Sequence, residues 1–205
     1  MEKQGKDIKD VIVKTTKILL MEKGNATIKE IADKAYVNVA AINYHFGSKD
    51  NLIEIVIKEV ISDLRNEILA SIDNFNIVDY NFEETIMYMF EIIFTFAEKN
   101  AGIINYSFLQ LANQSKAANI LVELFITDKD FINTITKQLA LVLPDASNDV
   151  LFSKYIILFS AFVVPFFLSF SGWYPFFNNK NQTTTTFLDK YRKSYLQELK
   201  NIVFC

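Results

Sequence analysis

Histidine and cysteine, two side chains much used in catalysis and in zinc binding, are scarce in this 205-residue chain. His45 is the sole histidine, and the sole cysteine, Cys205, is the last residue. Multi-histidine metal sites, thiol clusters and internal disulfides are therefore excluded, as are most histidine-dependent triads. No nucleophile–base pair or phosphate-binding loop stands out, so we expect no enzymatic activity, no metal and no cofactor.

The most distinctive polar side chains lie close together around residue 45. Tyr44 and His45 carry a phenol and an imidazole, which can reach phosphate oxygens or base edges. Lys49 follows directly after Ser48, a residue type that caps helices. A lysine in the first turn of a helix adds its charge to free amides and to the dipole, which together bind phosphate. Each residue alone has an ordinary alternative as a structural histidine or a surface lysine.

The elements that position these side chains are predicted to be helices. Apolar residues recur at helical spacing over residues 7–23, and Gly24 is a typical helix end. Thr27 and Glu30 then have the form of a capping box, which predicts a short helix over 28–35.

A second short helix follows after a turn of about three residues. Asn38 is expected to cap it, and it is predicted to span 39–46. Ser48 then begins a long helix that carries an apolar stripe towards residue 73. Two short helices behind a longer one form a helix-turn-helix, whose second helix enters the major groove of DNA.

The residues of this region also follow a recognisable pattern at many fixed offsets. The pattern consists of Thr27-Ile28-Lys29-Glu30-Ile31-Ala32, Ala35-Tyr36-Val37-Asn38 and Ile42-Asn43-Tyr44-His45-Phe46-Gly47-Ser48-Lys49-Asp50-Asn51-Leu52. Over about residues 8–60 it resembles the tetracycline-repressor (TetR) family, especially members with Tyr-His-Phe before a Ser-Lys-acidic turn. The remaining residues are similar in size and helical layout only.

The resemblance implies an all-α protein with a three-helix DNA-binding domain. It implies DNA contacts by Thr27, Asn38, Tyr44, His45 and Lys49, and it makes Val39, Ala41 and Asn43 the sequence-reading positions. The chain departs from the family pattern at Tyr36 (often Gly), Asn38 (Ser), Ala40 (Gly) and Asn43 (Tyr). These changes leave the fold expectation intact and bear on the operator sequence.

Charge is distributed unevenly along the chain. Residues 1–50 carry nine lysines against seven acids, and the rest carries twelve basic against seventeen acidic residues, for a total of −3. A mildly basic head on an acidic body suits a small DNA-contacting module, although a solvated lysine-rich helix gives the same balance. The chain starts with charged residues and no apolar secretion core, so we expect a cytoplasmic protein.

The second part of the chain is richer in aromatic residues. Of nineteen phenylalanines, Phe46 is the one that precedes the polar segment 73–81, the predicted domain boundary. We therefore expect a DNA-binding domain over 1–50, a connecting helix over 48–73, and a ligand-binding and dimerisation domain over 74–205. Helices are predicted there at 82–99, 101–112, 115–143, 149–171 and 184–203. Glu84, Glu91 and Glu98 recur every seven residues, which indicates a solvated face.

A charge-free run covers residues 155–179. Its length meets the criterion for a transmembrane helix, but it contains Pro165 and several serines. The resemblance favours burial in a homodimer, because the last two long helices of the family pair with their copies. The last helix carries a matching apolar seam at Leu188, Tyr191, Tyr195, Leu199 and Ile202.

The aromatic residues of the second part predict an apolar pocket for a small hydrophobic or amphipathic molecule. Polar orientation is expected from Tyr88, Asn105, Tyr106, Gln110 or Tyr155. The alternative is a core filled completely by its own phenylalanines. The expected lining is Tyr88, Phe90, Phe94, Tyr106, Phe108, Phe125, Tyr155, Phe159, Phe162, Phe166 and Trp173.

Together these patterns predict a ligand-responsive transcriptional regulator that acts as a repressor. It is expected to bind a palindromic operator in double-stranded DNA as a homodimer, without contact with a membrane. Two alternatives stay open: a membrane-associated or lipid-handling helical protein, and an enzyme.

Overall fold

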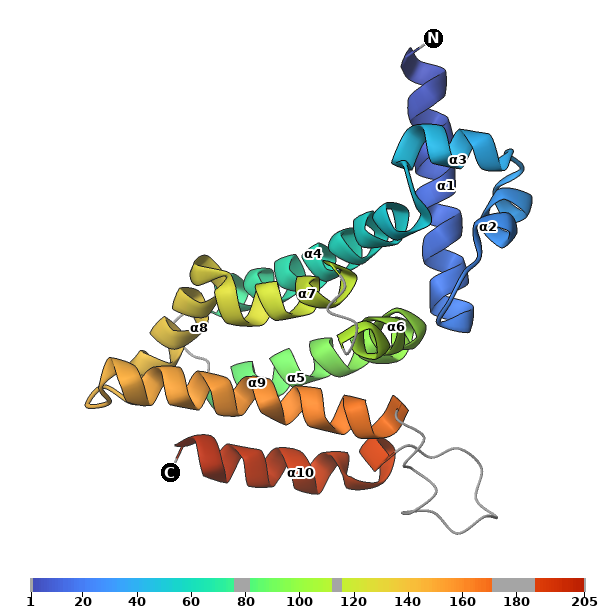
Figure 1. Cartoon of the computed structure of the whole chain (residues 1–205). Helices are drawn as coiled ribbons and strands as arrows, with labels where there is room; N and C mark the ends of the chain where they lie inside the picture. Colours follow the sequence, from blue (N-terminus) through green and yellow to red (C-terminus); the bar gives the residue numbers. More distant parts are fainter. Residues whose placement is uncertain (1, 76–81, 112–115, 171–186, 205) are drawn as a thin grey trace. The chain divides into compact units, whose positions relative to one another are not determined.

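The computed structural model describes residues 2–75, 82–111, 116–170 and 187–204, and these ranges are almost entirely helical (Figure 1). The all-α fold expected from the sequence is therefore confirmed. In chain order the elements are α1 (Glu2–Lys23), α2 (Ile28–Ala35), α3 (Val39–Phe46), α4 (Lys49–Phe75), α5 (Phe82–Lys99), α6 (Ala101–Leu111), α7 (Lys116–Val122), a π-helical turn η1 (Glu123–Thr127), α8 (Lys129–Val142), α9 (Asn148–Phe170) and α10 (Phe187–Phe204).

The chain forms two compact units, and the first contains residues 1–64 and 97–123. Within it, α1 packs against α2 and α6, α2 packs against α3, and α6 packs against α7. Ile12, Leu20, Ile31 and Ile42 are completely buried at these contacts, because the apolar positions of α1 to α3 recur at helical spacing. The three N-terminal helices therefore share one small core.

The contact between α1 and α6 is unusually close at Gly102. A Cβ atom on Gly102 would collide with the carbonyl oxygen of Leu20 and lie 2.7 Å from that of Met21. It would also lie 3.0 Å from the backbone nitrogen of Gly24. The two backbones meet here because no side chain separates them.

The second unit contains residues 65–96 and 124–205. In it α9 packs against α8 and, as an antiparallel pair, against α10 (Figure 1). Tyr195 of α10 donates its hydroxyl to the Ala161 carbonyl at 2.8 Å, and Lys154 of α9 donates to the Ile202 carbonyl at 2.8 Å. These two bonds fix the register of the last two helices.

The predicted single helix over 115–143 is wrong. The segment breaks into α7, the π-helical turn η1 and α8, which begins at Lys129 after the cap Asp128. The Asp128 carboxylate accepts from the Phe131 amide at 3.0 Å and from the Arg65 guanidinium Nε at 2.6 Å. An aspartate that caps a backbone amide begins a new helix, so the apolar periodicity concealed a break.

The two compact units do not coincide with the predicted domains. The first unit takes up residues 97–123, and α4 runs through the unit boundary after Leu64. Of the predicted boundary 73–81, residues 76–81 lie outside the described ranges. The functional division at residues 50 and 74 stays a prediction.

Two expectations about the surface can be compared with the structure. Glu84, Glu91 and Glu98 are all exposed on α5, as their spacing predicted. Among the helices of the described ranges, none is long and apolar enough to cross a membrane.

Candidate functional site

The start of α2 has the predicted capping box. The Glu30 amide donates to the Thr27 hydroxyl at 3.2 Å, and the Glu30 carboxylate accepts from the Thr27 amide at 2.8 Å. This backbone bond, together with Lys23 at 2.9 Å, lowers the pKa of Glu30 to about 2. The Thr27 hydroxyl also donates to the same carboxylate at 2.9 Å. A phosphate at Thr27 would therefore have to compete with a carboxylate for this helix end.

The second short helix, α3, has one buried and one exposed face. Asn38 caps it as predicted, accepting from the Ala41 amide at 2.7 Å. Ile42 and Phe46 face the core, whereas Tyr44 is 85% exposed. The Tyr44 ring meets the ring of His45 edge-on at a centroid distance of 5.1 Å. The exposed face therefore offers aromatic rings and hydrogen-bonding groups rather than charge.

A tight turn joins α3 to α4. Gly47 has a φ of 75°, and its amide donates to the Asn43 carbonyl at 2.8 Å. Ser48 then caps α4 by accepting from the Asn51 amide at 3.2 Å, as predicted. Lys49 is the first residue of α4 and is partly exposed, so its positive charge adds to the positive end of the helix dipole. This is the arrangement that favours a phosphate.

All eight residues predicted to contact DNA belong to the first unit and are reachable by solvent. Thr27, Asn38, Val39, Asn43 and Tyr44 are exposed, while Ala41, His45 and Lys49 are partly exposed. Their contacts with DNA stay a prediction. In the described parts of the chain, no group of three His, Cys, Asp or Glu side chains is placed to hold a metal ion.

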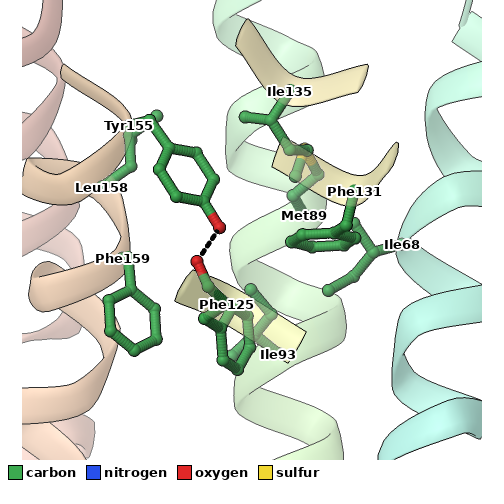
Figure 2. A pocket seen from close by; sticks show the side chains of 9 residues that line it. All are labelled: Ile68, Met89, Ile93, Phe125, Phe131, Ile135, Tyr155, Leu158 and Phe159. Atoms are coloured by element: carbon green, nitrogen blue, oxygen red, sulfur yellow. Dashed lines mark hydrogen bonds between the residues drawn. The ribbon is translucent and has the colours of Figure 1, made fainter. Parts of the chain in front are cut away.

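The second unit contains a small cavity of about 30 Å³ (Figure 2). Figure 2 shows the Tyr155 hydroxyl pointing at the Phe125 carbonyl, to which it donates at 2.5 Å. Burial raises the pKa of Tyr155, so the phenol stays a neutral donor. The remaining lining atoms are apolar. The cavity is lined by Ile68, Met89, Ile93, Phe125, Phe131, Ile135, Tyr155, Leu158 and Phe159.

Three of the eleven predicted pocket residues line this cavity: Phe125, Tyr155 and Phe159. Phe90 and Phe94 are completely buried in the same unit and stack on each other at a centroid distance of 6.1 Å, but they are not lining residues. Tyr88 is 48% exposed, Tyr106 and Phe108 (with Asn105 and Gln110) belong to the first unit, the side chains of Phe162 and Phe166 are not described, and Trp173 lies outside the described residues.

The lining residues that the sequence did not reveal are mostly aliphatic. Met89 and Ile93 are four residues apart on α5, as are Phe131 and Ile135 on α8. This spacing places each pair on one helical face, and that periodicity was the available signal. Aromatic content alone also favoured Phe90 and Phe94, which are core residues that do not line the cavity.

Comparisons with known proteins agree on one group. The model of the bacterial regulatory proteins of the tetR family matches residues 12–56. A curated relative is the biofilm operon icaADBC HTH-type negative transcriptional regulator IcaR of Staphylococcus aureus, known from several strains including Newman and COL. It is 27% identical over 137 residues, which are 65% of this chain and 68% of the relative.

A solved structure resembles almost the whole chain. It is a putative TetR-family transcriptional regulator from Mesorhizobium loti MAFF303099, with a TM-score of 0.65 and 11% sequence identity. The similarity covers 97% of each chain. At this identity it supports the fold, including the helices beyond residue 56 that the family model does not match.

Proposed function

This chain belongs to the tetR family of bacterial regulatory proteins and is a transcriptional regulator with a helix-turn-helix, and we propose that it is a ligand-responsive repressor. As a homodimer it binds a palindromic operator through α3, and an apolar effector in the second unit changes that binding. The observation that carries the proposal is the exposed face of α3, which ends beside Lys49 at the start of α4. Support for repression comes from IcaR, whose name describes a negative regulator.

DNA binding is tested by selecting duplexes from a random pool and measuring affinity by fluorescence anisotropy at several salt concentrations. Lys49→Ala should weaken binding to every duplex and lower the salt slope by about one unit, because one phosphate contact is lost. Asn43→Ala should instead change the preference among operator variants.

The matched control is Lys137→Ala, which removes the same charge from an exposed position on α8. It should leave the salt slope unchanged. If the parent protein binds no selected duplex, the proposed function is wrong.

The proposed dimer uses exposed apolar side chains of α9 and α10. Ile202 is 56% exposed and Phe152 is 45% exposed. In contrast, Leu199 is buried within the chain, and the Tyr195 hydroxyl donates a hydrogen bond to the Ala161 carbonyl. A charge at Leu199 or Tyr195 would therefore disturb folding as well as assembly. Ile202→Glu is the sharper variant, because a twofold interface places the new charge at the contact twice.

Sedimentation should show a dimer for the parent protein and a monomer for Ile202→Glu at micromolar concentration. Both should retain the same helical circular dichroism. A parent protein that sediments as a monomer contradicts the dimer proposal.

The proposed effector is a neutral and largely apolar molecule. The one polar lining group with a hydrogen to donate, the Tyr155 hydroxyl, already bonds to Phe125. A cavity of about 30 Å³ is also far smaller than the roughly 150 Å³ cavity that accommodates benzene in an engineered protein. Effector binding therefore requires the walls to move, and the Phe125 and Phe159 rings, which are tilted against each other with centroids 4.6 Å apart, are the side chains we expect to separate.

This proposal is tested by measuring the melting temperature of the protein in the presence of three kinds of compound: neutral aromatic, fatty-acyl and cationic. A ligand of the folded state at a hundredfold excess over its Kd stabilises the protein by about 2.7 kcal/mol. We expect a shift with neutral compounds and a matching change in operator affinity. A panel that shifts neither quantity would overturn ligand sensing and leave DNA binding untouched.

A further inference from the structure

Tyr36 has an unfavourable backbone conformation at the end of α2. Its φ of 55° and ψ of 40° are left-handed, and among the described residues it is the one non-glycine residue with a positive φ. Its amide donates to the carbonyls of Ala32 and Asp33, and the Val37 amide donates to the Ala32 carbonyl at 3.0 Å. This helix ending favours glycine, because a Cβ atom is strained in this conformation.

The Tyr36 side chain does not compensate for this strain within the fold. It is 95% exposed, so its ring contributes almost nothing to the core. Within the part of the chain that the structure describes, the phenol has no hydrogen-bond partner and the ring has no aromatic partner. A strained residue whose side chain supports no neighbour points to a role outside the chain.

The position of Tyr36 in the chain indicates which kind of molecule its side chain contacts. The residue lies in the turn between α2 and α3, two residues before the cap Asn38. Val39 and Tyr44 are exposed on the helix that follows. In a helix-turn-helix the first residues of the second helix contact base edges, so the turn before them lies beside the wall of the groove, which is made of phosphates.

We propose that Tyr36 is a further DNA-contacting residue, whose phenol hydroxyl donates a hydrogen bond to a phosphate oxygen of the operator. The proposal rests on the proposed function, because it needs α3 in the major groove. A phosphate contact fixes the position of the protein without reading bases, so Tyr36 contributes to affinity for every operator variant equally. A neutral phenol releases no counterion, so its contribution is independent of salt.

Two variants separate this role from a structural one. Tyr36→Phe keeps the ring and the strain and removes the hydroxyl. It should weaken binding about three- to tenfold, the size expected for one hydrogen bond, with an unchanged melting temperature and an unchanged salt slope. Tyr36→Gly should weaken binding at least as much while raising the melting temperature, because glycine relieves the strain.

Tyr36→Gly should therefore raise the melting temperature and weaken DNA binding at the same time. A residue with a purely structural role would not give this combination. Lys49→Ala provides the contrast, since it should lower the salt slope. Leu141→Ala, at a 74% exposed position on α8, is the control for loss of an exposed apolar side chain and should bind like the parent.

The outcomes distinguish the two proposals. If Lys49→Ala weakens binding while Tyr36→Phe binds like the parent, the Tyr36 contact is wrong and the proposed function stands. If the parent binds no selected duplex, both are wrong. A Tyr36→Phe variant whose loss of affinity is accompanied by a lower salt slope or a lower melting temperature also overturns the proposal.

Discussion

Helices meet in two very different ways in the two units of this protein. In the first unit, α1 and α6 approach until their backbones touch at Gly102, with no room for one further carbon atom. In the second unit, nine large side chains from α4, α5, η1, α8 and α9 surround a cavity that they do not fill (Figure 2). One contact is limited by the backbone and the other by the shapes of side chains.

The difference shows which part of the fold can adapt. Backbone contacts at Gly102 can relax only if a whole helix moves, whereas Phe125 and Phe159 can change rotamers one at a time. A site for an effector needs the second kind of packing. The comparison therefore makes opposite predictions for added volume in the two units.

Removing volume from the cavity wall has the largest expected effect. Phe131 is 2% exposed and packs edge-on against Phe125, so Phe131→Ala should destabilise the protein by about 3–5 kcal/mol in a denaturant titration. The enlarged space should also admit benzene, which should raise the melting temperature of the variant more than that of the parent. Ile42→Ala, a buried truncation in the first unit, is the control and should gain nothing from benzene. Equal responses would remove the distinction between the units.

Adding a single methyl group at the tight contact is the next largest effect. Gly102→Ala should destabilise by about 1–3 kcal/mol, because the new Cβ collides with the Leu20 carbonyl and α6 must shift. In an unconstrained helix the same change stabilises by about 1 kcal/mol. The sign of the change in unfolding free energy therefore shows whether α1 and α6 are in close contact at Gly102. An unchanged or raised melting temperature would contradict the close contact.

The helix-turn-helix could be predicted from the sequence because its signals are local. Thr27, Glu30, Asn38 and Ser48 each act on an amide three residues away, and the bounds of α2 and α3 agree with the prediction. Tyr36 marks the limit of this reasoning. The sequence shows that Tyr36 replaces the glycine often found at this position in the family. Only the structure shows that the backbone there is still left-handed.

The second unit was less predictable because its signals are long-range. Asp128 interrupts an apolar pattern that otherwise continues, and its pairing with Arg65 joins residues far apart in sequence. The choice between core phenylalanines, such as Phe94, and cavity-lining ones, such as Phe125, depends on how five segments pack together. Composition indicated the aromatic core but not the position of its gap.

Adding volume at the cavity should be tolerated, in contrast to Gly102. Leu158 is buried against the cavity, and Leu158→Phe directs a larger ring into the empty space. We expect a change in unfolding free energy of less than about 1 kcal/mol, of either sign. The effector response should fall at the same time, since the space is already occupied. A loss of stability larger than that of Gly102→Ala would show that the cavity cannot adapt.

Acid should have the smallest effect, and it tests charge at the start of α2 rather than volume at the cavity. The pKa of Glu30 falls from 4.5 to about 2 on folding, so its carboxylate stabilises α2 above pH 4.5, and this contribution is lost as the pH falls through about 2. Glu30→Gln still accepts from the Thr27 amide but cannot pair with Lys23. The parent should therefore melt at a higher temperature than Glu30→Gln at pH 6, and the difference should shrink below pH 4.5 and disappear near pH 2. The cavity lining contains no carboxylate, so the difference between the parent and Leu158→Phe should stay constant over the same range. A Glu30→Gln difference that is independent of pH would show that the side chain stabilises the helix by shape alone.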